Sequence, residues 1–131
     1  MNASPILGVA YKNGSAILLA RVVGSDGSPI VQSTITAAVY TISPVDPDHP
    51  DADTPIDGHE NVEVVPSALI HNTLQLDDLW GDLDEVGYNF RHEIDISEAA
   101  AFPTRGEQYR IHWTLTTPGQ PIVFDFLVDA I

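Results

Sequence analysis

The chain has 131 residues, no cysteine and a formal net charge of −14. This length suits one domain with its own core, so we expect a single domain over residues 1–131. Without cysteine, disulfides, thiolate metal sites and a cysteine nucleophile are excluded. The charge disfavours nucleic acid and anionic membranes as partners, and suits a basic protein surface, a cation or solubility alone.

The first seven residues carry neither a basic segment nor a long apolar run. This pattern predicts no signal peptide. No apolar segment reaches the length of a membrane-spanning helix. We therefore expect an intracellular product.

Two apolar runs, Ile6 to Tyr11 and Ser15 to Val23, flank the turn signal Lys12-Asn13-Gly14. Asn-Gly between two such runs predicts an N-terminal β-hairpin. The second run is apolar on both faces, which is typical of a strand covered on both sides. The cover is either loops of the same chain or another subunit. In the second case the interface residues are Ile17, Leu19, Arg21 and Val23.

Acidic residues dominate the middle of the chain. Thirteen of the nineteen Asp and Glu residues, and neither Lys nor Arg, lie between Val22 and Phe90. Residues 43–60 are rich in Pro and Asp and predict a solvated loop. Alternating aspartates also suit calcium, but the glycine and glutamate positions of an EF-hand loop are missing. We expect no cofactor, and the weak metal candidates are Asp46, Asp48, Asp51 and Asp53.

Strands are expected on both sides of this loop, at Ile30 to Ile42, Val62 to Val65 and Ala68 to Leu76. Asp77 to Glu85 is expected to form one helical turn that packs Trp80 down as an anchor. The last third alternates apolar and polar residues with the period of half-buried strands. Seven or eight short strands with turns between them predict an all-β, antiparallel β-sandwich. The structural side chains are expected to be Trp80, Tyr88, Phe90, Tyr109 and Trp113.

No arrangement of residues in the sequence selects a catalytic site. There is no GxSxG elbow, no HxxxH or HExxH pair and no glycine-rich phosphate loop. His92 shares an apolar face with Phe90 and is expected to be an inward, hydrogen-bonded residue. His112 is expected to be solvated, and His59 lies in the acidic loop. We therefore expect that the protein is not an enzyme.

The segment from Trp80 to Thr116 contains Gly87-Tyr88-Asn89-Phe90, Phe102-Pro103 and Gly106-Glu107-Gln108-Tyr109-Arg110. These motifs resemble immunoglobulin-like accessory proteins of tailed bacteriophage virions, over about the last half of the chain. The resemblance implies an immunoglobulin-like sandwich with a tyrosine corner, in which the Tyr109 phenol bonds a nearby backbone group.

The resemblance also implies a non-catalytic virion protein, either a capsid decoration or cement protein or a head–tail or tail accessory. Its location would be the virion, and the host cytoplasm during assembly. Its partners would be copies of itself and capsid or tail proteins with a basic surface, not nucleic acid or membrane. The alternative is a carbohydrate-binding β-sandwich module, with or without calcium. Trp80 would be its stacking platform, because Trp113 alternates with polar neighbours as a core residue does.

Overall fold

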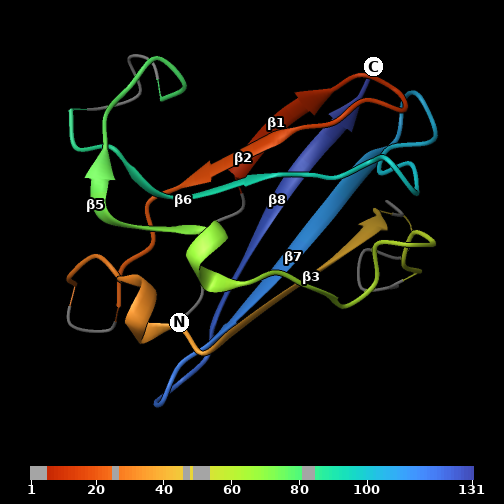
Figure 1. The fold of residues 1–131 in the computed structure, drawn as a ribbon. Helices are drawn as coiled ribbons and strands as arrows, with labels where there is room; N and C mark the ends of the chain where they lie inside the picture. Colours follow the sequence, from red (N-terminus) through yellow and green to blue (C-terminus); the bar gives the residue numbers. More distant parts are fainter. Residues whose placement is uncertain (1–5, 25–26, 46–47, 49–53, 81–84) are drawn as a thin grey trace.

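The computed structural model describes residues 6–24, 27–45, 48, 54–80 and 85–131, with backbone alone for 6–10. These residues form eight strands and two short 3-10 helices, arranged as two layers (Figure 1). The helices are η1 (Gln32–Thr34) and η2 (Pro66–Ala68). The strands are β1 (Ile6–Ala10), β2 (Ile17–Ala20), β3 (Ala37–Pro44), β4 (Val62–Glu63), β5 (Ile70–Gln75), β6 (Tyr88–Glu93), β7 (Gln108–Thr116) and β8 (Ile122–Ala130). Within the described ranges, no helix is long and apolar enough to cross a membrane.

The strand order is that of an immunoglobulin-like sandwich. One sheet has five strands in the order β1-β8-β7-β3-β4, and the other has three in the order β2-β6-β5. In immunoglobulin terms, β2, β6 and β5 occupy the places of strands B, E and D, while β3, β7 and β8 occupy those of C, F and G. All strand pairs are antiparallel except β1 with β8, which run parallel. The predicted all-β sandwich is confirmed.

The N-terminal hairpin is the part of this prediction that is wrong. The turn itself is present, with the Gly14 N–H bonded to the Tyr11 carbonyl at 2.8 Å and Asn13 at φ 61°. However, β1 pairs with β8 and β2 pairs with β6, so the turn carries the chain from one sheet to the other. An Asn-Gly signal specifies local backbone conformation, whereas strand pairing here depends on partners more than 70 residues away.

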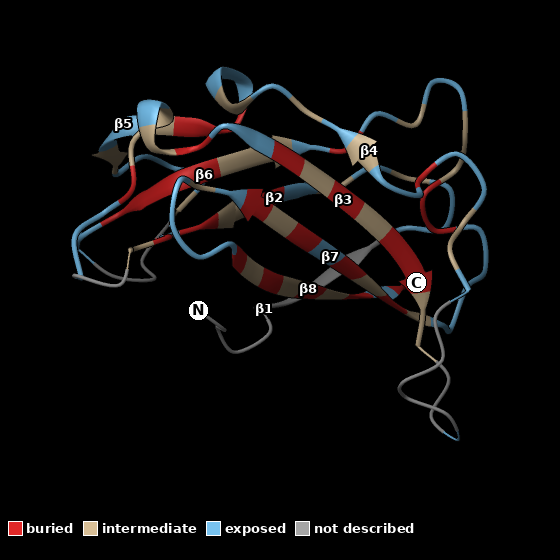
Figure 2. Cartoon of the chain, turned by 90° about the horizontal axis from the view of Figure 1, so that it is seen from below, coloured by how far each residue is buried: buried red, intermediate tan, exposed pale blue. Residues whose placement is uncertain are grey.

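The core lies between the two sheets. Along β7 and β8, buried residues alternate with half-buried or exposed ones as the period of a strand requires, which Figure 2 shows as red bands along both strands. Phe90 of β6 meets Trp113 of β7 and Phe124 of β8 edge to face, with ring centroids 5.0 and 5.2 Å apart. Such edge-to-face geometry adds to the stabilisation from burial alone. The core therefore joins the three-stranded sheet to the centre of the five-stranded one.

Two polar side chains fix the connections between strands. The Thr104 N–H donates to the Tyr109 hydroxyl oxygen at 2.9 Å, which is the bond of a tyrosine corner. Asn89, buried in β6, accepts from the Val22 N–H at 2.7 Å and donates to the Val22 carbonyl at 2.8 Å. A second, longer bond joins the Asn89 amide to the Ile30 carbonyl at 3.2 Å. The Asn89 side chain therefore supplies, beyond the end of β2, hydrogen bonds in place of the backbone bonds between β2 and β6.

The acidic loop is shorter than predicted. Ser43 and Pro44 belong to β3, and part of residues 54–60 folds back onto that strand. The Ile42 N–H donates to the His59 carbonyl at 2.8 Å, and the Ile56 N–H donates to the Ile42 carbonyl at 2.8 Å. These bonds bury His59, although the sequence placed it in a solvated loop. His59 is buried because residues 54–60 return along β3 and bond the backbone of Ile42. They occupy the same edge of β3 that β4 occupies further along the strand.

Candidate functional site

The predicted interface residues lie on β2, an edge strand of the three-stranded sheet. Ile17 and Leu19 are on its outer face, opposite Glu93 and Arg91 of β6, while Leu18 and Ala20 point into the core. Ile17 is 42% exposed and Leu19 is half-buried. Arg21 is exposed just after the strand ends. These three residues therefore share one open face.

Val23 does not belong to this face as a strand residue. It lies beyond the end of β2, in an isolated bridge with Pro29, and is half-buried. The predicted strand continued to Val23, but β2 ends at Ala20. The bonds of Asn89 to Val22 end the regular ladder, which explains the shorter strand.

The outer edge of β2 presents backbone groups away from β6. The Ala16 carbonyl accepts from the Ile94 N–H at 3.0 Å, so Ala16 and Ile94 form a hydrogen-bonded pair. Such pairs alternate along an antiparallel ladder. Leu18 and Ala20 therefore bond β6, whereas the N–H and C=O groups of Ile17 and Leu19 point the other way. Among the described residues, no strand pairs with that side of β2.

In the part of the chain that the structure describes, this edge has none of the sequence devices that usually protect an edge strand. Proteins block such edges with lysine, proline, bulges or very short strands. The opposite edge strand of this sheet, β5, has a register shift between Ile70 and Gln75. In the other sheet, the edge strand β4 has only two residues. By contrast, β2 is regular and its sequence Ile-Leu-Leu-Ala contains no charge and no proline.

The charges around β2 differ from those of the chain as a whole. Arg21 donates to the Gly87 carbonyl at 3.2 Å, and Arg91 and Glu93 lie on the same outer face. The hydrogen bond from the Tyr88 hydroxyl at 2.7 Å and, more weakly, the Arg91 guanidinium lower the pKa of Asp77. Positive and negative groups are thus mixed around β2, in a chain of net charge −14.

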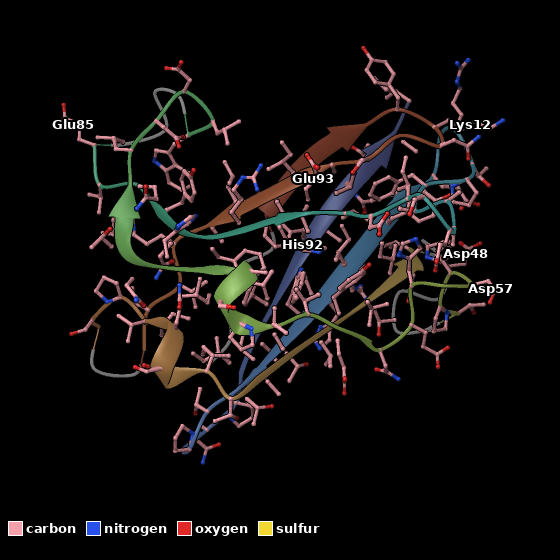
Figure 3. The ribbon with its side chains drawn as sticks, viewed as in Figure 1. Lys12, Asp48, Asp57, Glu85, His92 and Glu93 are labelled. Carbon is pink, nitrogen blue, oxygen red and sulfur yellow. The ribbon has the colours of Figure 1, made fainter. Side chains whose placement is uncertain are left out.

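The acidic residues are divided between opposite ends of the sandwich. Figure 3 shows Asp48 and Asp57 at one end and Glu85 at the other, with Glu93 between them beside β2. The sequence presented these residues as one acidic stretch. The fold separates them because the two segments join strands at opposite ends.

Of the four weak metal candidates in the sequence, the structure describes one. Asp48 is exposed, and Asp46, Asp51 and Asp53 lie outside the described residues. Within the described residues, no three His, Asp or Glu side chains are grouped so that they could hold a metal ion.

His59 links β3 to two loops. Its Nε2 lies 2.9 Å from the Ala99 carbonyl, which can only accept, so Nε2 carries the proton. The Tyr40 hydroxyl then donates to Nδ1 at 3.0 Å. A hollow of about 370 Å³ beside this pair is lined by Asp57, Asp95 and Glu98 among others. Burial and the nearby Asp95 raise the pKa of Tyr40. His59 therefore connects β3 to the loop that contains Ala99 through both imidazole nitrogens.

His92 lies inside the sandwich, as expected, but its bonding differs from the expectation. Its ring lies 5.3 Å from that of Tyr40 and 5.0 Å from that of Trp113. Its Nδ1 is buried and has no hydrogen-bond partner among the described groups. Burial, with smaller effects from Arg91 and His59, lowers the pKa of His92 to about 4. His92 is therefore a neutral core residue at pH 7.

Trp80 and Trp113 differ in their access to solvent. Trp113 is fully buried, so it offers no surface for sugar stacking. Trp80 follows Asp77 in a hydrogen-bonded turn and is half-buried against Tyr88, with ring centroids 5.7 Å apart. The same turn exposes Leu79, and Leu76 before it is also exposed. Residues 81–84, the rest of the predicted helical turn, lie outside the described residues.

Sequence reasoning missed two of the residues that organise this region. Its alternation with Tyr88 and Phe90 would turn Asn89 to the polar face of its strand, and the acidic loop would expose His59, whereas both side chains are buried. The only local signal for Asn89 is its place in the Gly87-Tyr88-Asn89-Phe90 motif, and Gly58 at φ 85° marks the turn that buries His59. A scan against protein-family models and searches of curated proteins and of solved structures gave no match.

Proposed function

We propose that the protein is a non-catalytic structural component of a tailed-phage virion that acts through protein–protein contacts. It would serve as a capsid decoration or cement protein, or as a head–tail or tail accessory. The observation that carries the proposal is the edge of β2, which no described strand covers and which combines outward backbone groups with the exposed Ile17 and half-buried Leu19 side chains. An edge of this kind is a template for pairing with another chain.

Two further features support the proposal. The strand order and the corner bond of Tyr109 agree with the immunoglobulin-like fold that the resemblance implied. Among the buried polar groups, Tyr40 and His59 bond each other. His112 bonds Asp125 at 2.6 Å on the exposed face of the five-stranded sheet, outside any hollow described above.

The test is whether the chain is a stoichiometric part of particles. Particles would be purified on a density gradient from a lysate of the host that carries the gene, and the chain would be quantified against the major capsid protein. We expect a fixed ratio for the wild type. Absence of the wild-type chain from purified particles would contradict the proposal.

A pair of matched variants tests the surface itself. Leu19→Asp should leave the chain in the soluble fraction, because it puts a charge on the β2 face. Val65→Asp introduces the same charge at another exposed apolar residue, 65% exposed, and should still co-sediment. Both variants should keep the wild-type circular dichroism spectrum. Retention on a polysaccharide that Trp80→Ala abolishes would instead favour the carbohydrate-binding alternative.

A further inference from the structure

The structure assigns a specific partner to the β2 edge, namely the β2 edge of a second copy of this chain. This inference rests on the proposed role in protein–protein contacts. The two β2 strands run antiparallel about a two-fold axis that passes beside Leu19. Two three-stranded sheets then join into one continuous six-stranded sheet in the order β5-β6-β2-β2-β6-β5.

The hydrogen-bond register of β2 fits such a pair. The free backbone groups belong to Ile17 and Leu19, both odd-numbered, because Ala16 and its even-numbered successors bond β6. A two-fold axis at Leu19 sets Leu19 opposite Leu19 of the second copy, and Ile17 opposite Arg21. Odd-numbered residues then meet odd-numbered residues, so the outward groups of one copy face the outward groups of the other. A register slipped by a single residue, with the axis midway between Leu18 and Leu19, would lose this match, since it would pair odd residues with even ones.

The charges on the outer face are complementary in the same arrangement. Glu93 lies opposite Ile17 in the register of β2 with β6. Arg21 of the second copy would lie on the far side of Ile17, in the same row and on the same face. The two Cα atoms would be about 10 Å apart, which is two strand spacings. Extended Arg and Glu side chains bridge such a span, and the two-fold axis produces the ion pair twice.

The local charge also permits this contact in a strongly acidic chain. The −14 net charge would oppose most contacts between copies. Around β2, however, Arg21 and Arg91 accompany Glu93, and the β2 strand itself carries no charge. Of the other acidic residues labelled in Figure 3, Asp48 and Asp57 lie toward one end of the sandwich and Glu85 toward the other, away from this side. Self-association through β2 therefore brings together the part of the surface where repulsion is weakest.

Single cysteines test the register directly, because the chain has no cysteine of its own. At a hydrogen-bonded antiparallel pair the Cα atoms are about 5.5 Å apart, which is within the range that a disulfide spans. Leu19→Cys should therefore oxidise to a covalent dimer. Ile17→Cys is the matched control, because its own copy would lie about 14 Å away, four residues along the strand. We expect Leu19→Cys to cross-link about a hundredfold faster than Ile17→Cys at micromolar protein, since pairing gives thiols a millimolar effective concentration.

A mixture completes the test of register. Ile17→Cys mixed with Arg21→Cys should give a mixed disulfide, although neither variant forms a dimer quickly alone. In a separate experiment, Glu93→Arg and Arg21→Glu should each weaken dimerisation in sedimentation velocity, and the double swap should restore it. Equal cross-linking at positions 17 and 19, or no gain from the double swap, overturns the proposed pairing.

These results are separable from those on the proposed function. If the wild type co-sediments with particles but Leu19→Cys does not cross-link, the structural role stands and the pairing with a second copy is wrong. If Leu19→Cys cross-links but the chain is absent from particles, the pairing stands and the virion role is wrong.

Discussion

Acidification should destabilise the fold through one inward-facing, partly buried histidine, His92. Its ring lies between those of Tyr40 and Trp113, and Leu18 of β2 is its cross-strand neighbour. The charged neighbours that shift its pKa are Arg91, next in sequence, and His59, and both disfavour an imidazolium. Burial with no acceptor for Nδ1 among the described groups favours the neutral ring.

The size of the loss in the free energy of unfolding follows from the pKa of His92, which is lowered from 6.5 to about 4 in the folded chain. Between these two values the unfolded chain binds a proton that the folded chain does not, so the free energy of unfolding falls as the pH falls. Each pKa unit corresponds to about 1.4 kcal/mol. The loss is therefore about 3 kcal/mol in total, beginning near pH 6.5 and complete near pH 4.

Urea unfolding at several pH values between 7 and 4 measures this loss. The comparison is with His92→Leu, which replaces the titrating imidazole with an apolar side chain of similar size. We expect the free energy of unfolding of the variant to fall by about 3 kcal/mol less than that of the wild type over this range. Asp77 and Asp95 also have lowered pKa values, but they are present in both proteins and cancel in the comparison.

A second variant separates titration from packing. Ile94→Val shortens a buried side chain close to His92 in sequence and should lower stability by the same amount at every pH. Parallel pH dependences for the wild type and His92→Leu would refute the reasoning, because the histidine would then be accessible or bonded in its charged form.

Three other predictions concern the core, a connection and the charged ends. Trp113→Ala should cost about 3–5 kcal/mol in urea unfolding, as for other buried aromatic residues; a loss under about 1 kcal/mol would place this ring at the surface. Asn89→Ala should cost about 3 kcal/mol, since it leaves the buried Val22 N–H without its acceptor, and an unchanged midpoint would contradict that role. If a basic partner binds one acidic end, neutralising two carboxylates there should slow association and flatten its salt dependence, measured by surface plasmon resonance on purified capsid or tail protein. The two matched pairs, one at each end, are Asp48 with Asp57 and Asp78 with Glu85; equal effects of both pairs would argue against an oriented contact.

Local pattern alone was enough to predict the faces of the best-defined strands. In β7 and β8 the alternation of apolar and polar residues specified which side chains are buried, because a strand turns successive residues to opposite faces wherever it pairs. The corner at Tyr109 was also predictable from its local motif, since its partner Thr104 is only five residues away. These features depend on contacts within a strand or across one short turn.

Strand pairing was decided only by the tertiary structure. The turn at Asn13 was correctly predicted, yet β1 joined β8 and β2 joined β6. The apolar runs on either side of that turn could have paired with each other or with strands far along the chain. Which strand each run pairs with depends on the packing of both sheets together, and a short segment of sequence does not contain this information.

The proposed interaction surface on β2 depends on the same long-range strand pairing. Because β2 does not pair with β1, its outer edge stays open among the described residues, and Ile17 and Leu19 become a face on a free edge. Likewise, the fold places acidic residues of one sequence stretch at two ends of the sandwich. It also places His59 where it bonds Tyr40 instead of facing solvent. Sequence periodicity determined which residues could face outward, and the folding of distant strands onto one another decided which of them another chain could reach.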